Sequence, residues 1–393
     1  MFRPRLVADT GRVPLFWFLA AVFSVSVGRN SYSLACSWLL VASGHGTLPV
    51  AIFFAATCVV ELAASPIAGW LCDRYDRRTV SIASDLLRLV GALVLASVIM
   101  TTDVFWAIVL SVIVFGVCDR LSLTATQSMI PAFTAGRSRA KTNSAVFVFL
   151  QCGGLVAAVA IGLLLHAWPS WITLVFIACC FCLSCVCMVA VPEEGRVVRP
   201  HFTVEGSMPL DATLLRLAGI YALLNAGGLL ISVIGPSFVF QEHLGNALDF
   251  GHLEGAWSAG SILGVLLLVP IARATSLSSL HLMVLVVMAG LFAATAFLTF
   301  SWSVLVIAIL GATYNLGRVS VEVALQACVS REALGRAKGL MHSVAVAFGL
   351  LLFVIVSFLS SNVRPSTVFL IFAAFVVLST GLLAKLPPHR SKH

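Results

Sequence analysis

Ionisable side chains lie deep inside long apolar segments of this chain, and they are the residues with which it could do chemistry. A charge in hydrocarbon costs about 3 kcal/mol or more unless it is paired or hydrated. Arginine can hold a carboxylate through two parallel hydrogen bonds, and a buried acid can take up and release a proton. The set therefore indicates anion binding, proton exchange or structural ion pairing. It consists of Arg29, Glu61, Asp85, Arg88, Asp119, Arg120, Arg318 and Glu322.

Spacing along the chain favours particular ion pairs. Asp85 and Arg88 are three residues apart, so the two side chains can meet on one face of a helix. If the whole set is structural, Glu322 neutralises Arg318 one turn away, and Asp119 pairs with Arg29. This closed set of ion pairs is the alternative to a functional site.

Polar and aromatic side chains at similar depth extend the candidate site. Trp257 could stack on an aromatic group of a bound molecule, or it could simply pack in the core. Asn225 precedes two glycines, which allow close packing or flexing of the backbone. The residues predicted to bind a substrate or to couple protons are Arg29, Asn30, Glu61, Asp119, Arg120, Gln127, Asn225, Trp257, Arg318 and Glu322.

Composition identifies the kind of protein that must position these residues. Of 393 residues, 60% are hydrophobic and only 10% charged, and mean hydropathy is +1.06. A soluble domain needs far less apolar surface, so a polytopic membrane protein in contact with a lipid bilayer is predicted. The net charge of +8 comes from short basic stretches between apolar runs, which does not indicate a nucleic-acid partner.

The apolar runs predict an all-α protein with twelve membrane-spanning helices. About 20 apolar residues are needed to cross the hydrocarbon core. Charges, prolines and glycines divide the chain into spans near residues 14–42, 48–71, 79–100, 104–130, 141–165, 169–191, 213–240, 251–271, 280–299, 303–329, 338–360 and 365–385.

Orientation follows from the basic residues between the spans. Most of the 24 Lys and Arg residues fall on one side if the N-terminus is cytoplasmic, and Arg364 alone falls in an outer loop. The excess of positive charge in cytoplasmic loops predicts that both termini are cytoplasmic. The expected location is a bacterial cytoplasmic (inner) membrane, with the protein as a multi-pass monomer.

The two halves of the chain repeat one another. Residues 125–149 align without gaps on residues 324–348, and both segments contain a Gly-Arg-x-basic loop. This parallel repeat predicts two pseudo-symmetric six-helix bundles at residues 1–191 and 213–393, joined by a cytoplasmic linker at residues 192–212.

The loop between the second and third spans carries the most specific motif. Residues 69–78 read GWLCDRYDRR, and residues 84–88 read SDLLR. The first segment resembles the loop between helices 2 and 3 of the major facilitator superfamily of transporters. The second, with Gln127 and Pro131 at the end of the fourth span, resembles the branch that contains macrolide-efflux and enterobactin exporters.

The resemblance implies a fold and residue roles. In the major facilitator fold, helices 1, 4, 7 and 10 surround a central cavity, which would place Arg29, Arg120 and Arg318 there and leave Asp85 and Arg88 structural. Asp73 would pair with the amino end of helix 11 near Gly339, where the helix dipole favours a carboxylate. This conformational latch would comprise Gly69, Asp73, Arg74, Arg77 and Arg78, although inside-positive charge alone could also explain the basic residues.

Departures from the branch qualify the function that the resemblance implies. Helix 5 lacks the Gly-Pro pair of the antiporter signature, and Arg29 stands where the branch often has an acid. These departures weaken the case for proton exchange and for cationic drugs that the resemblance alone would make. The intramembrane acids and arginines nevertheless favour a proton-coupled exporter of a small polar or anionic metabolite such as a siderophore, working by alternating access. A multidrug efflux pump or a siderophore importer is the alternative. Without a P-loop, a His-rich metal motif or paired catalytic acids, neither an enzyme nor a cofactor is expected.

Overall fold

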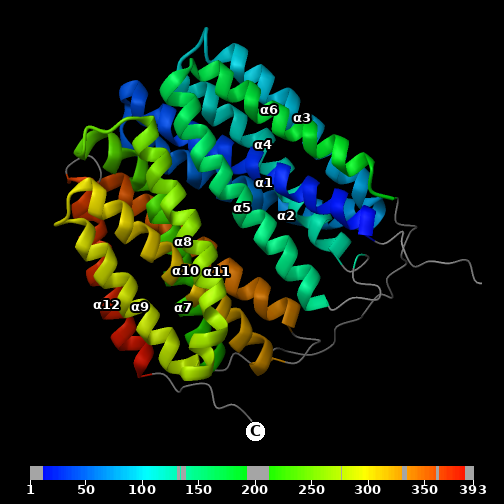
Figure 1. The fold of residues 1–393 in the computed structure, drawn as a ribbon. Helices are drawn as coiled ribbons and strands as arrows, with labels where there is room; N and C mark the ends of the chain where they lie inside the picture. The colour runs from blue at the N-terminus through cyan, green and yellow to red at the C-terminus, as the bar shows by residue number, and fades with distance from the viewer. Residues whose placement is uncertain are drawn as a thin grey trace, which may run out of the picture. The chain divides into compact units, whose positions relative to one another are not determined.

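The computed structural model describes residues 12–130, 133, 139–192, 212–275, 277–329, 334–359 and 363–385. These ranges fold into twelve α-helices without a strand (Figure 1). The helices are α1 (Arg12–Leu40), α2 (Thr47–Arg74), α3 (Arg77–Val98), α4 (Val104–Met129), α5 (Arg139–Ala167), α6 (Ser170–Val189), α7 (Ala212–Ser237), α8 (Ala247–Ala274), α9 (Leu277–Thr295), α10 (Phe300–Cys328), α11 (Leu334–Leu359) and α12 (Pro365–Ala384). Two π-helical turns follow α1 and α7, namely η1 (Val41–His45) and η3 (Phe238–Glu242).

Each predicted span coincides with one of these helices, and the boundaries agree within a few residues. Nine helices in the described ranges are long and apolar enough to cross a membrane, and Ser279–Thr295 in α9 is a shorter apolar segment. The all-helical architecture is thus confirmed, whereas twelve crossings and cytoplasmic termini remain predictions. The predicted linker, both chain ends and the loop around Arg137 lie outside the described residues.

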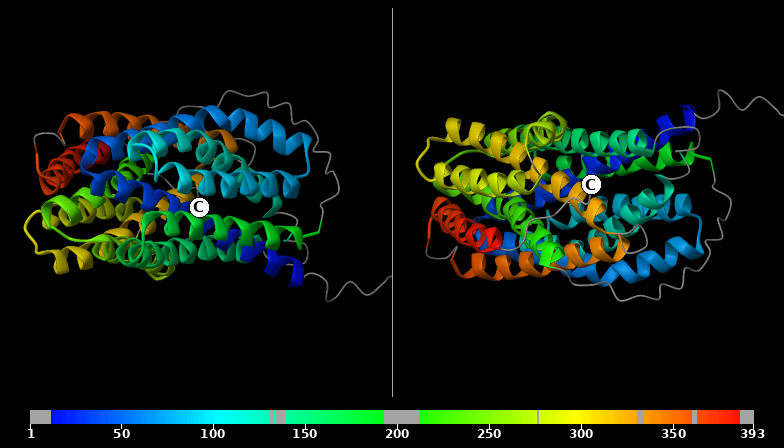
Figure 2. Two further views of the ribbon diagram at one scale, coloured as in Figure 1. Left: turned by 90° about the horizontal axis from the view of Figure 1, so that it is seen from above. Right: turned by 90° about the horizontal axis from the view of Figure 1, so that it is seen from below.

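The described residues form two compact units. The first unit draws on residues 1–39 and 56–199, and the second on residues 40–55 and 200–393. Helix α2 therefore begins in the second unit and ends in the first. Within each unit the helices run alongside one another as in a helix bundle (Figure 2).

In the first unit, small and polar side chains hold α1 against its neighbours. The Ser26 hydroxyl donates a 2.6 Å hydrogen bond to the Leu150 carbonyl oxygen of α5. A Cβ atom added to Gly153 would lie 2.6 Å from the Ser26 Cβ atom, so only glycine fits there. On α4, the Phe115 ring stacks on Tyr32 with centroids 3.7 Å apart. Helix α3 packs against both α4 and α6.

In the second unit, glycines on α8 bring its backbone into direct contact with the backbone of α10. Gly260 and Gly264 face the carbonyl groups of Ala308 and Ala312, with no room for a Cβ atom at either glycine. Small residues at helix contacts permit this approach in membrane proteins, where tight packing replaces the hydrophobic effect between helices.

We expect Gly264→Ala to destabilise the protein by about 1–3 kcal/mol or more, because the added methyl group would overlap the Ala312 carbonyl group. Gly290→Ala on α9 is the matched control, since nothing lies within 4 Å of its added Cβ atom. The control should be neutral or gain up to about 1 kcal/mol of helix stability. Thermal unfolding of the detergent-solubilised variants measures both, and equal midpoints would contradict the proposed close contact.

Candidate functional site

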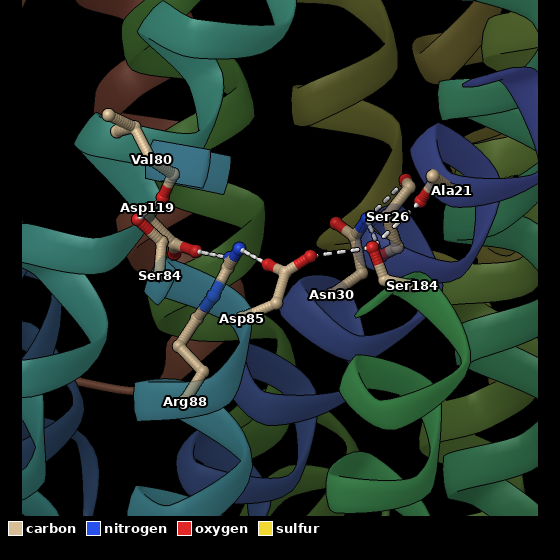
Figure 3. Close-up of polar contacts among 9 residues, drawn as sticks. All are labelled: Ala21, Ser26, Asn30, Val80, Ser84, Asp85, Arg88, Asp119 and Ser184. Carbon is tan, nitrogen blue, oxygen red and sulfur yellow. Dashed lines mark hydrogen bonds and ion pairs between the residues drawn. The ribbon is translucent and has the colours of Figure 1, made fainter. Parts of the chain in front are cut away.

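A buried ion cluster forms the polar centre of the first unit (Figure 3). On α3, the Arg88 guanidinium bonds the Asp85 carboxylate and also Asp119 on α4. The Arg88 and Asp85 side chains are fully buried, and that of Asp119 is 11% exposed. The Ser184 hydroxyl of α6 donates a 2.6 Å hydrogen bond to the second oxygen of Asp85. The Arg88 guanidinium also lies 4.5 Å from the centre of the Phe181 ring, within cation–π range.

The sequence of α3 explains why these charges point inward. Asp76 caps the helix by accepting a 3.2 Å hydrogen bond from the Thr79 backbone N–H. The buried residues recur at helical spacing and include Ser81, Ser84, Asp85 and Arg88, while large apolar side chains on the opposite face, Leu86, Leu87 and Val90, are about half exposed. The polar face therefore packs against α4 and α6, and the apolar face is left for lipid.

The predicted partner of Asp119 was wrong. The ion-pair alternative joined Asp119 to Arg29, but the carboxylate bonds Arg88 instead. Helix α3 packs along α4, and this contact brings the enclosed Arg88 side chain to Asp119. The expectation that Asp85 and Arg88 meet on one helix face is confirmed. With one cation between two carboxylates, this buried triad has a formal charge of −1.

The same Asp119 side chain also belongs to a second group of charges. Electrostatic interactions connect Glu61 on α2 with Asp119, Arg29 and Arg120. None of Arg29, Glu61 and Arg120 makes a direct ion pair with another described residue, and the buried Arg120 Nε atom has no hydrogen-bond partner among them. We call Arg29, Glu61, Asp119 and Arg120 the first-unit cluster. Glu61 interacts with the other three members, and of the four only Asp119 is held in a direct ion pair, with Arg88.

The other candidates of the first unit, Asn30 and Gln127, make no polar contact with the first-unit cluster among the described residues. The Asn30 side-chain amide donates a 2.7 Å hydrogen bond to the Ser26 carbonyl oxygen one turn earlier. The Gln127 side chain is exposed, two turns of α4 beyond Arg120, and has none of the polar contacts that define the cluster within the described ranges.

In the second unit, candidate residues from three helices meet around Arg318. Its Nε atom lies 3.9 Å from a carboxylate oxygen of Glu322, and the two side chains are 40% and 36% exposed. Electrostatic interactions connect Arg318 with Tyr314 and Tyr221. The Trp257 ring lies 5.2 Å from the Tyr314 ring, centre to centre. We call these five residues the second-unit cluster, an accessible cation lined by aromatic rings.

Asn225 lies on α7, one turn after Tyr221, and its side chain is partly buried. It has no polar contact with the second-unit cluster among the described residues. The glycine pair that follows it serves packing: a Cβ atom on Gly228 would lie 3.2 Å from the Tyr314 ring, and one on Gly227 would lie 3.1 Å from the Met288 sulfur.

In the loop after α2, the basic residues bind helix ends within the first unit. Arg77 donates a 2.9 Å hydrogen bond to the Ser128 carbonyl oxygen near the end of α4. Arg78 donates bonds of 3.1 and 2.6 Å to the carbonyl oxygens of Met188 and Val189 at the end of α6. Cations are favoured at such carboxyl ends because the last carbonyl groups lack helical partners.

The remaining latch residues, Gly69, Asp73 and Arg74, make no such hydrogen bonds to helix ends among the described residues of the first unit. Asp73 and Arg74 are exposed, with Arg74 lying 5.4 Å from the centre of the Trp70 ring, and Gly69 has nothing within 4 Å of its potential Cβ position. The proposed partner of Asp73 belongs to the other unit, so the latch remains a prediction.

One buried acid escaped the sequence analysis. Glu254 on α8 is only 8% exposed. The predicted span began at residue 251, which placed this residue at a helix end. The helix in fact begins at Ala247, behind a capping box formed by Asn246 and Asp249. That Asn-x-x-Asp signal is readable in the sequence and would have placed Glu254 inside the span.

Comparison with known proteins decides the family. The family model "Major Facilitator Superfamily" matches residues 18–317, about three quarters of the chain. This chain belongs to the major facilitator superfamily. The pump named "Multidrug efflux pump Tap" of Mycobacterium tuberculosis (strain ATCC 25618 / H37Rv) is 28% identical over 97% of this chain and 95% of its own length. The pump of the same name from Mycolicibacterium fortuitum is 26% identical over 87% of this chain and 88% of its own.

Solved structures share the fold at low sequence identity. The nucleoside transporter NupG has a TM-score of 0.73 at 17% identity, over 95% of this chain and 98% of that one. A bacterial homologue of the iron transporter ferroportin has a TM-score of 0.75 at 17% identity, over the same shares. Membership of the superfamily, together with the efflux-pump relatives, makes this chain a multi-pass membrane transporter of small molecules and not an enzyme, as the sequence predicted.

Proposed function

We propose that this transporter is a proton-driven exporter of small organic molecules. The observation that carries the proposal is the first-unit cluster, in which Glu61 interacts with Arg29, Asp119 and Arg120 without a direct ion pair to a described residue. A carboxyl group without a fixed ionic partner can bind and release a proton as its surroundings change. The carboxylate of a closed ion pair stays ionised instead. Export is supported by the two relatives, both named as efflux pumps.

The mechanism that we propose is alternating access of two six-helix bundles, with twelve spans and both termini in the cytoplasm. Residues 1–191 and 213–393 would form these bundles, and a bacterial cytoplasmic membrane would hold the protein as a monomer. The distribution of basic residues supports this orientation.

Amphiphilic, drug-like molecules are the cargo that we consider first. The relatives named above are multidrug pumps, and none of them is named for a siderophore. The aromatic rings of Trp257, Tyr221 and Tyr314 offer the stacking surfaces that such molecules use. A small anionic metabolite is the second candidate, because the Arg318 side chain is 40% exposed and could bind a carboxylate.

Transport into proteoliposomes tests both the proposed proton coupling and the class of substrate. A gradient of about one pH unit supplies about 1.4 kcal/mol per proton, which is equivalent to about tenfold accumulation. We expect a cationic fluorescent drug to accumulate under such a gradient and to leak away when a protonophore is added. Accumulation of an aromatic carboxylate instead would favour the second cargo. Gradient-independent transport of both would refute the proton-driven mechanism.

The proposed latch gives a separate prediction. Asp73→Asn should slow transport several-fold while substrate affinity stays unchanged, because the exposed carboxylate would only stabilise one conformation of the transporter. Lys385→Gln is the control, since it removes an exposed charge at the end of α12, outside the proposed latch. Initial transport rates and equilibrium binding measure the two effects, and an unchanged rate in Asp73→Asn would exclude the latch.

A further inference from the structure

Glu254 is a buried carboxyl group that neither cluster uses. It lies about two turns of α8 after the helix begins at Ala247, and it is 8% exposed. Its Oε1 atom has no hydrogen-bond partner in the described ranges, and no charged side chain described there pairs with it. An ionised carboxylate is strongly disfavoured in such surroundings, so the site fits an acid that carries its proton.

The wall facing Glu254 is the end of α7. A Cβ atom added to Gly235 would lie 3.8 Å from the Oε1 atom, and equally close to the side chains of Phe250 and Leu253. The next residue is Pro236, which lacks a backbone N–H, and η3 replaces the regular helix at Phe238. Single π-helical turns of this kind are frequent at functional sites. Glu254 thus borders the point where α7 loses regular helical bonding.

Neither Glu242 in η3 nor His243 after it pairs with Glu254, although the buried Nε2 atom of His243 has no hydrogen-bond partner in the described ranges. Glu242 accepts a 2.8 Å hydrogen bond from the backbone N–H of Ser366. The His243 ring packs edge-on against Phe238 at 4.6 Å and against Phe300 at 5.5 Å, measured between ring centres. Neither group compensates a charge on Glu254.

Among the described residues, the helices around Glu254 supply no counter-charge either. On α8 itself, Asp249 closes the capping box and His252 is exposed. Between Tyr221 and η3, α7 has no ionisable side chain, and α10 has none before Tyr314. A proton is therefore the ligand that this site can accept.

We infer that Glu254 is a proton-binding site of the second unit and couples the proton gradient to movement at the end of α7; this rests on the proposed proton-driven export. With cytoplasmic termini, α8 begins at the outer face, and Glu254 lies about 10 Å below that face. A proton from outside water would bind a carboxylate oxygen of Glu254. When α7 moves and water from the cytoplasmic side reaches the site, the same proton would leave to that water, so that one proton crosses the membrane in each cycle.

Transport by Glu254→Gln tests the coupling. Glutamine mimics the protonated acid in size, so the variant should still exchange labelled substrate across the membrane without a gradient. It should lose the accumulation that a pH gradient drives in the wild type, a change of about tenfold at about one pH unit. His252→Gln, which changes an exposed side chain of the same helix, is the control and should accumulate substrate like the wild type. Unchanged accumulation in Glu254→Gln would overturn the coupling role.

Infrared spectroscopy tests proton binding independently of transport. The C=O band of a protonated carboxylic acid should be present in the wild type and lost in Glu254→Gln. If that variant does not fold, the band is sought in folded Glu61→Gln protein with isotopically labelled glutamate carboxyl groups. The absence of a label-sensitive band would overturn the proton site. Gradient-independent transport by the wild type would instead refute the proposed function, while the band would still report on Glu254.

Discussion

Arg88→Met should destabilise the first unit by about 3–5 kcal/mol, because two buried carboxylates would lose the cation between them. Asp85 is fully buried and keeps only the Ser184 hydroxyl as a partner in the variant, and Asp119 loses its ion pair. Methionine fills a similar volume, so the lost charge rather than a cavity dominates the effect. Thermal or denaturant unfolding in detergent measures the loss.

The pH dependence separates this explanation from simple packing damage. Protonation of Asp85 and Asp119 removes the charges that Arg88 balanced, so the variant should recover stability as the pH falls. Arg318→Met is the control: its ion pair spans 3.9 Å between partly exposed side chains and should contribute about 1 kcal/mol or less. Equal losses in the two variants, or a loss in Arg88→Met that is independent of pH, would mean that the buried triad is not held by charge.

Helix α3 illustrates which structural features could be predicted from the sequence alone. Its helix, its cap and the Asp85–Arg88 pair follow from local spacing, and the sequence predicted them or contains their signals. The partnership with Asp119 depends on how α3 is rotated and shifted against α4, which side-chain packing decides and spacing along one helix cannot show. Asp119 was wrongly paired with Arg29 because the two residues were matched by their depth in the membrane, without knowledge of how the helices pack.

The candidate site shows the same limit. Arg318 and Glu322 were predicted from their spacing of one helical turn, but Tyr221 joins them from another helix and was missed. Glu254 was missed because the start of α8 was placed four residues too late. The sequence could nominate the charged members of both clusters, because charges in membrane spans are rare enough to be noticed one by one, but it could not show which of them lie together.

Glu61→Gln should abolish gradient-driven export of a cationic drug, a change of about tenfold at about one pH unit. In the first unit, three carboxylates (Glu61, Asp85, Asp119) face three guanidinium groups (Arg29, Arg88, Arg120), so the set is neutral when all are ionised. A proton on Glu61 raises the charge to +1, which would expel a bound cation. Glutamine fixes that positive state, so the variant can neither attract the cation nor respond to the gradient.

The same charge balance lets the Glu61→Gln variant distinguish a cationic from an anionic substrate. An anionic substrate would be attracted by the fixed positive state, so its exchange without a gradient should persist in Glu61→Gln while cation exchange is lost. His252→Gln again serves as the control, because His252 is exposed on α8 and belongs to neither cluster. Should Glu61→Gln export a cationic drug at the wild-type rate, the proton must bind elsewhere. Glu254 would then be the only acid of those described here that is both deeply buried and without an ionic partner.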